Sequence, residues 1–344
     1  MNRRDFLKNA LIVSAGALMP EKLQAQEKKA RITFAGDTLL GGYYNSKYGT
    51  MLDLVNTIDS IKEKSGLDGV VRHFFKNVIH LFNESDFSVL NLEGPLSQRY
   101  DASTIIKKMI PKAIPLRQHE DCLKILDLAG INLVSLANNH MYDFNNEEGL
   151  EYTIKNSIVD YIGAGKKEQA YSCKAKKING IKFAFFGLTN ILEPGNMIAT
   201  ENKIGVAGIP EKSNFNSSKC LNYALENIKS ATSYYDFVAV MLHAGPIGGP
   251  NPNSSQIELS KILIDNGADL VIGSHSHAKQ PIKIYDNKTV FYCLGNFIFG
   301  GKKGYQSLST IPIVDFYLNN GNKSIKYQTY DIHPNDGSFV PVLA

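Results

Sequence analysis

Five apolar segments of this 344-residue chain each end at side chains that can bind a metal ion or transfer a proton. Short apolar runs of this kind predict buried strands. The polar residues that follow the five runs are Asp37, then Asn91 and Glu93, then Asn138 to His140, then His243, and last His275 and His277. In open α/β sheets, ligands bind beyond the carboxyl ends of the strands. Five such ends therefore predict one site of carboxylate, amide and imidazole groups, a set suited to two metal ions.

Strand-like and helix-like segments alternate along the chain, which predicts an α/β fold. Strands are expected near 31–35, 86–90, 132–137, 181–187, 237–242 and 270–273, and from 282 onward the pattern consists of strands. Helices are expected within 50–83 and near 119–129, 146–157 and 217–230, and a further helix is expected from a capping box at Ser255 to Gly267. The chain has no internal repeat and no clear linker, so we expect a single domain over residues 27–344.

Residues 1–26 have the features of an export signal. Asn2-Arg3-Arg4-Asp5-Phe6-Leu7-Lys8 resembles a twin-arginine signal, and an apolar stretch and the cleavage-like sequence Leu23-Gln24-Ala25 follow it. The alternative is an ordinary basic helix start. We predict export through the twin-arginine route to the periplasm or another extracytoplasmic space. That route carries folded proteins, which suits a protein that binds metal before export.

The charge balance gives no support for nucleic-acid binding, because the net charge is only +4. One local basic cluster consists of Lys107, Lys108, Lys112 and Arg117. It is either a solvated face or a patch that attracts an anionic substrate. The four cysteines have no C-x-x-C spacing. An oxidising compartment permits disulfides between them, but buried free thiols are the simpler expectation.

His275-Ser276-His277 is the strongest metal signal, because two histidines two residues apart in a loop can reach one metal or two adjacent ones. His243 offers another nitrogen ligand. Asp37 and Glu93 offer carboxylates, and Glu93 is our candidate for a bridge between two metals.

Asn139 and His140 suggest two different tasks at one strand end. The amide oxygen of Asn139 can complete a metal shell, while the neighbouring His140 can protonate a leaving group. Asp143 follows three residues later and could orient the His140 ring. His140 and Asp143 are therefore the candidate catalytic residues.

A larger set of motifs, in this order, resembles the CapA family. The motifs are Gly36-Asp37, Asn91-Leu92-Glu93-Gly94-Pro95-Leu96, Ala137-Asn138-Asn139-His140, His243-Ala244-Gly245, Gly267 to Gly273, His275-Ser276-His277 with Gln280-Pro281, and Leu294-Gly295-Asn296-Phe297. That family is associated with poly-γ-glutamate capsule synthesis and is related to calcineurin-like metallophosphoesterases. The resemblance spans roughly residues 31–300. It implies a four-layer α/β/β/α sandwich with a dinuclear site between the sheet ends.

By motif position, the resemblance implies one metal held by Asp37, Glu93 and His277. It implies a second metal held by Glu93, Asn139, His243 and His275, with His140 as the acid. The expected cofactors are therefore two divalent ions, with Mn, Fe and Zn as the candidates. The chain departs from the phosphoesterase pattern at Leu39, where a third-position histidine is usual, and at Glu93, where Asp is usual. CapA-like sequences also commonly have a histidine at the position of Ser274.

Two functions remain open from the sequence. The first is an exported metal-dependent hydrolase that acts on a phosphoester, poly-γ-glutamate or another cell-surface polymer, with two metals activating a bridging water. The second is a non-catalytic module that binds an anionic polymer during capsule synthesis or export. Either function could involve membrane components of a capsule synthesis complex.

Overall fold

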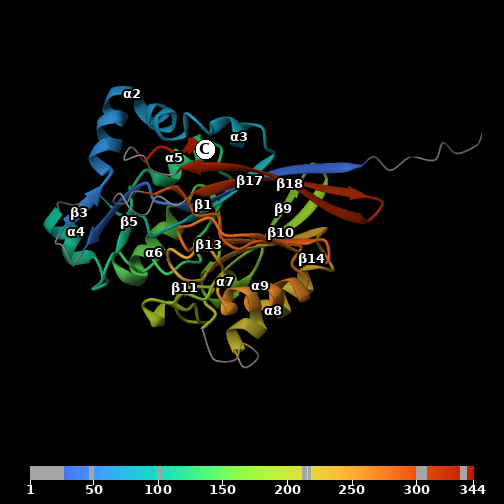
Figure 1. Cartoon of the computed structure of the whole chain (residues 1–344). Helices are drawn as coiled ribbons and strands as arrows, with labels where there is room; N and C mark the ends of the chain where they lie inside the picture. The colour runs from blue at the N-terminus through green and yellow to red at the C-terminus, as the bar shows by residue number, and fades with distance from the viewer. Residues whose placement is uncertain are drawn as a thin grey trace, which may run out of the picture.

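The structure is a computed structural model, and it describes residues 27–45, 50–98, 102–210, 215, 218–299, 308–333 and 339–344 (Figure 1). The predicted twin-arginine signal lies outside these residues. In the described part of the chain, two large sheets lie face to face, and helices cover the outer face of each sheet.

The first sheet has eight strands in the described residues, and its centre is parallel where β1 pairs with β4 and β4 with β6. In spatial order its strands are β19 (Val342–Leu343), β18 (Asn322–His333), β17 (Ser309–Asn319), β1 (Lys28–Thr38), β4 (Phe87–Leu92), β6 (Leu133–Ser135) and β7 (Asp160–Ile162), with β16 (Asn296–Ile298) paired to β1. Strands β17 and β18 extend the sheet as an antiparallel ribbon.

The second sheet has six strands in the described residues, of which the four central ones run parallel. In spatial order they are β14 (Ile282–Tyr285), β15 (Lys288–Phe291), β13 (Leu270–His275), β12 (Phe237–Ala244), β10 (Ile181–Thr189) and β9 (Lys174–Ile178). Parallel neighbours place their carboxyl ends at the same edge of a sheet, which is the condition for a shared site.

Three groups of buried apolar side chains hold the layers together. Between the sheets, alternate residues such as Phe34 of β1 and Phe185 of β10 pack against one another. The other face of the first sheet packs under α2 (Val55–Phe75), α3 (Ile79–Asn83) and α5 (Cys122–Leu128), and that of the second packs under α7 (Lys167–Tyr171), α8 (Lys219–Ala231) and α9 (Ser254–Asp265). The four-layer α/β/β/α sandwich is therefore confirmed.

Smaller elements surround the ends of the strands. They are α4 (Ala102–Lys108), α6 (Asn146–Lys155), the 3-10 helix η1 (Gly195–Met197), a sheet of β3 (Thr50–Asp53), β2 (Gly41–Asn45) and β5 (Leu116–Gln118), and the pair β8 (Ala164–Gly165) and β11 (Gly205–Val206). The expected strands and helices include neither α4 nor β5, which lie between the strand near 86–90 and the helix near 119–129. Strand β5 forms by pairing with β2, which is distant in the sequence, so the local sequence pattern does not predict it.

One further expectation is corrected in detail. Helix α9 is capped by the side chain of Asn253, which accepts a hydrogen bond from Gln256 N at 2.8 Å, so the helix starts at Ser254 rather than at Ser255. Asparagine caps helices as well as serine does. Cys293 lies just after β15. The expected buried free thiols are confirmed at Cys122 and Cys293.

Candidate metal centre

The carboxyl ends of β1 and β4 in the first sheet meet those of β12 and β13 in the second. Register places Asp37 beside Asn91 in the first sheet, and His243 beside Ser274 in the second. Gly36 permits this arrangement, because a Cβ there would lie 1.8 Å from the Gly295 carbonyl oxygen. The parallel strands thus bring the predicted site residues to one place between the sheets.

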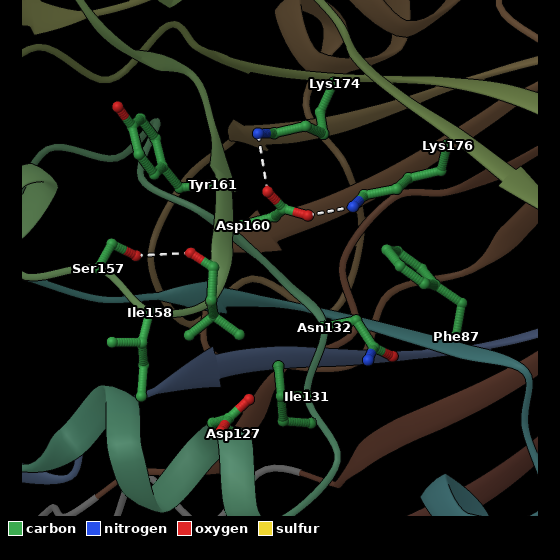
Figure 2. Close-up of a pocket in the computed structure, with 11 residues that line it drawn as sticks. Phe87, Asp127, Ile131, Asn132, Ser157, Ile158, Asp160, Tyr161, Lys174 and Lys176 are labelled. Atoms are coloured by element: carbon green, nitrogen blue, oxygen red, sulfur yellow. Dashed lines mark hydrogen bonds and ion pairs between the residues drawn. The ribbon is translucent and has the colours of Figure 1, made fainter.

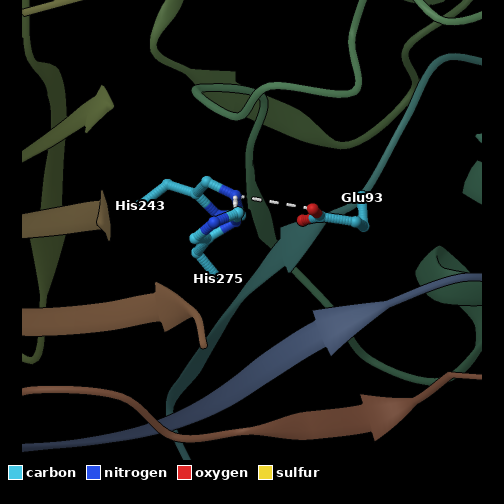
Figure 3. A group of neighbouring side chains, drawn as sticks. All are labelled: Glu93, His243 and His275. Atoms are coloured by element: carbon cyan, nitrogen blue, oxygen red, sulfur yellow. Dashed lines mark hydrogen bonds and ion pairs between the residues drawn. The ribbon is translucent and has the colours of Figure 1, made fainter. Parts of the chain in front are cut away.

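Glu93, His243 and His275 form a buried group whose candidate ligand atoms all lie within 4.8 Å of one another (Figure 3). His275 Nδ1 lies 3.0 Å from His243 Nε2, which in turn lies 3.4 Å from Glu93 Oε1. Glu93 Oε1 is buried and has no hydrogen-bond partner in the described residues. A buried carboxylate oxygen without a partner is costly, and a cation between these three side chains would satisfy it. The donor set therefore fits a divalent transition metal.

Asn139 adds an amide oxygen to this group. Its Oδ1 lies 2.9 Å from His243 Nε2. On the other side of the ring, His243 Nδ1 lies 2.9 Å from Ser274 Oγ. A hydrogen bond at Nδ1 orients the ring so that Nε2 faces the centre, as is usual for histidine ligands. Ser274 thus supports the His243 ring from behind.

A second group lies directly beside the first. His277 Nδ1 is 3.3 Å from Asp37 Oδ2 and 2.7 Å from Asn296 Oδ1. Asn91 connects the two groups, because its Nδ2 donates to Asp37 Oδ1 at 2.8 Å and also to Glu93 Oε2. Leu39 is buried and offers no ligand atom. The second group therefore has fewer donors than the first.

The His-x-His loop adopts an unusual backbone. His275 and His277 have φ values of 92° and 53°, in the region that L-residues rarely occupy. Such conformations are costly and concentrate at functional sites. Here they let two side chains from one short loop enter the same buried centre.

His140 lies next to the centre and is held by a carboxylate. Its Nδ1 contacts Asp143 Oδ2, and its Nε2 lies 3.7 Å from Glu93 Oε1. Asp143 is fully buried and also accepts a hydrogen bond from Leu116 N at 2.9 Å. The expected proximity of His140 and Asp143 is therefore present, with Nε2 free to face a bound substrate.

Burial dominates the electrostatics of the site. It raises the pKa of Glu93 well above its usual range, and the nearby Asp37 charge raises that pKa further. Burial lowers the pKa of both His243 and His275 well below the ordinary histidine value, and neighbouring imidazoles add to this effect. Burial also lowers the pKa of His277, but its hydrogen bonds to Asp37 and Asn296 outweigh this and leave it raised. Neutral imidazoles are the form that binds metal.

From these shifts we predict that His243 causes part of the pH dependence of the stability of the metal-free protein. Below pH about 6.5 the unfolded chain protonates this histidine while the folded chain resists, so its contribution to stability falls as pH falls. Glu93 and His277 act in the opposite direction, so wild type must be compared with His243→Gln. Between pH 7 and 5, chelator-treated wild type should lose up to about 1.4 kcal/mol more stability per pH unit than the variant. Urea unfolding at each pH measures this, and parallel pH curves would contradict it.

The pattern of apolar runs identified Asn91 but missed two other supporting residues, Asn296 and Lys112. Asn296 stands in a family motif, and the structure adds its contact with His277. Lys112 belongs to the basic cluster. Its side chain is only 7% exposed and Arg117 is buried as well, so a solvated face is wrong for these two residues. The available sequence signal for the burial of Lys112 was its position between Pro111 and apolar neighbours.

A separate cavity of about 340 Å³ lies at the amino ends of β4, β6 and β7, away from the predicted site residues (Figure 2). In it, Asp160 of β7 pairs with Lys174, at 2.7 Å, and with Lys176, both from β9. Strands β7 and β9 are edge strands of the two different sheets. These ion pairs link the sheet edges, and charged side chains there also discourage pairing with other chains.

Comparison with known proteins agrees with the resemblance to the CapA family. The family described as "Bacterial capsule synthesis protein PGA_cap" matches residues 31–301. The "PGA biosynthesis protein CapA" of Bacillus subtilis is 27% identical over 311 residues, which cover 88% of this chain and 71% of that protein. The "Capsule biosynthesis protein CapA" of Bacillus anthracis is 28% identical over 332 residues, which cover 95% and 73% of the two chains.

Among solved structures, the NAD nucleotidase NadN of Haemophilus influenzae aligns with a TM-score of 0.48 and 11% identity. The alignment covers 93% of this chain and 54% of NadN, so the chain spans about half the length of that structure.

Proposed function

This chain belongs to the bacterial capsule synthesis protein family, and from that premise we propose that it is an exported, metal-dependent hydrolase. One observation carries the proposal: Glu93, His243 and His275 form a buried ligand group, and His140 lies beside it with its ring oriented by Asp143. A proton donor next to the ligands accelerates hydrolysis and has no task in binding alone.

In the proposed mechanism, Glu93, His243, His275 and Asn139 would hold one divalent ion, and Asp37 and His277, together with Glu93, would hold a second. Such ions would polarise the substrate and lower the pKa of a bound water. The chain supplies the rest. Asp143 keeps the Nδ1 side of His140 occupied, and the imidazole delivers a proton from Nε2 to the leaving oxygen or nitrogen. Mn, Fe and Zn all suit the donor set.

The proposed substrates are a phosphoester or a cell-surface polymer such as poly-γ-glutamate. The names of the Bacillus relatives support the polymer, because they refer to PGA and capsule biosynthesis. Membrane components of a capsule synthesis complex are the proposed partners. In the part of the chain that the structure describes, no helix is both long and apolar enough to cross a membrane.

A non-catalytic role in polymer binding is the second candidate, and Leu39 favours it. This buried leucine occupies the position where phosphoesterases usually carry a ligand, so the second metal group is incomplete. An anionic polymer could then be held at the remaining metal without being cleaved.

Metal analysis followed by an activity screen separates the two candidates. Protein purified without chelators is analysed for its elements and then tested on aryl phosphodiesters and on γ-glutamyl polymers. Metal with turnover that a chelator abolishes supports the hydrolase. Metal and polymer binding without any turnover supports the binding module instead.

We also propose export through the twin-arginine route, on the basis of Arg3 and Arg4. Replacing both by lysine should leave the protein in the cytoplasm with its first 25 or so residues uncleaved, because the arginine pair is the part of the signal that is read. Cell fractionation and intact mass measure the outcome. Normal export of the double variant would show that another signal operates.

A further inference from the structure

We propose that Lys112 is a positioning residue that fixes Asp143 and, through it, sets His140 against the metal centre. This inference rests on the proposed function. Lys112 lies in the segment between α4 and β5, outside all the motifs that predicted the site. Its side chain is nevertheless almost fully buried beside them.

The ammonium group of Lys112 contacts two separate segments, residues 139–143 and the loop that contains Glu193. It donates to Asn139 O at 3.0 Å, to Asp143 Oδ1 at 3.3 Å and to Glu193 O at 3.4 Å. It also lies 3.4 Å from His140 Nδ1. An ammonium has three donors, and the three oxygen atoms occupy them. Lys112 is therefore placed to hold the site together rather than to receive a substrate anion.

Asp143 depends on this contact because its carboxylate is buried and has several hydrogen-bond partners. Its Oδ2 serves both His140 Nδ1 and Leu116 N, so Oδ1 is left to Lys112. Without the ammonium, Oδ1 would be buried with a negative charge and no partner in the described residues, which is strongly unfavourable. The carboxylate would turn or draw in water, and the imidazole would lose its fixed orientation.

The backbone keeps Lys112 in place. Ile110 N donates to Asp143 O at 3.0 Å, and Asn145 N donates to Lys108 O at 2.8 Å. These bonds join the segment before Lys112 to the segment that contains Asp143. The lysine stem therefore starts from a position that is fixed relative to the residue it holds.

Lys112→Met tests the proposal, because methionine keeps the aliphatic stem and removes the charge. Rates are measured on aryl phosphodiesters with a range of leaving groups, for wild type, Lys112→Met, His140→Ala and the double variant. We expect Lys112→Met to lose about 10-fold or more on the poorest leaving group, the range that an orienting partner supplies. The loss should largely disappear on the best leaving group, which needs little protonation.

In the His140→Ala background, Lys112→Met should change the rate by less than about twofold, since a residue that acts through His140 has nothing left to position. Lys112→Arg should restore part of the lost rate. Lys62→Met, which removes another lysine paired with a buried aspartate, Asp121, should keep the wild-type leaving-group dependence. An equal loss on every leaving group, or full additivity with His140→Ala, would overturn the proposal.

A second measurement does not need turnover. The proton on His140 Nδ1 can be followed by NMR and identified by its loss in His140→Ala. It should shift or broaden in Lys112→Met and stay unchanged in Lys62→Met. If wild type hydrolyses no substrate, the proposed function fails, while an unchanged His140 signal in Lys112→Met overturns the positioning role separately.

Discussion

His275→Ala is expected to bind its metal at least about 100-fold more weakly than wild type and to lose nearly all hydrolysis. Loss of a residue that only hydrogen-bonds a metal ligand lowers metal affinity about 10- to 100-fold. His275 would itself be a ligand, so its loss should cost more. The candidate group has only three His or Glu donors, so one loss leaves Glu93 and His243 with the amide of Asn139. Calorimetric titration of chelator-treated protein measures the affinity, and elemental analysis measures the retained metal.

The matched control is His80→Ala, which removes an exposed histidine from α3 without touching the site. It should keep the wild-type metal content and rate. Glu93→Gln should behave like His275→Ala, because it replaces the buried carboxylate with a neutral amide. Wild-type metal content in both His275→Ala and Glu93→Gln would mean that the cluster has a structural role only.

His140→Ala is expected to keep its metal and its fold but to lose roughly 10- to 1,000-fold in rate on poor leaving groups, about 1.4–4 kcal/mol of transition-state stabilisation. The imidazole contacts Asp143 through Nδ1 and lies 3.7 Å from Glu93 through Nε2. It can therefore reach a substrate at the metal without being a ligand itself. Steady-state kinetics on paired substrates with good and poor leaving groups measure the effect.

A good leaving group should partly rescue His140→Ala, because it departs with less protonation. His119→Ala is a suitable comparison, since His119 is also buried and bound to an aspartate, Asp59, yet is not among the site residues. Full activity of His140→Ala on poor leaving groups would show that His140 is not the acid.

The apolar runs predicted the strand ends well, for a physical reason, whereas the four layers were implied by the family resemblance. Buried parallel strands must be apolar on both faces, so β12 and β13 appear as apolar runs, and the first polar residue marks the edge of the sheet. The common direction of the strands within each sheet brings Asp37 beside Asn91, and His243 beside Ser274. The packing of the two sheets, which the family resemblance implied, then brings these two sets together.

The supporting residues could not be predicted in this way. Lys112 and Asn296 reach the site from a segment next to α4 and from the short strand β16, and their roles depend on tertiary contacts. Strand β5 was missed for the same reason, because it pairs with β2 across more than seventy residues of chain. Local pattern carries no information about such partners.

The most direct test of the metal centre is anomalous X-ray diffraction from crystals of protein purified without chelators. We expect an anomalous peak between Glu93, His243 and His275, within ligand distance of the Asn139 amide oxygen, and a weaker peak or none beside Asp37 and His277. The absorption edge identifies the metal. A metal-loaded crystal that shows no peak at Glu93, His243 and His275 would contradict a metal centre at these residues.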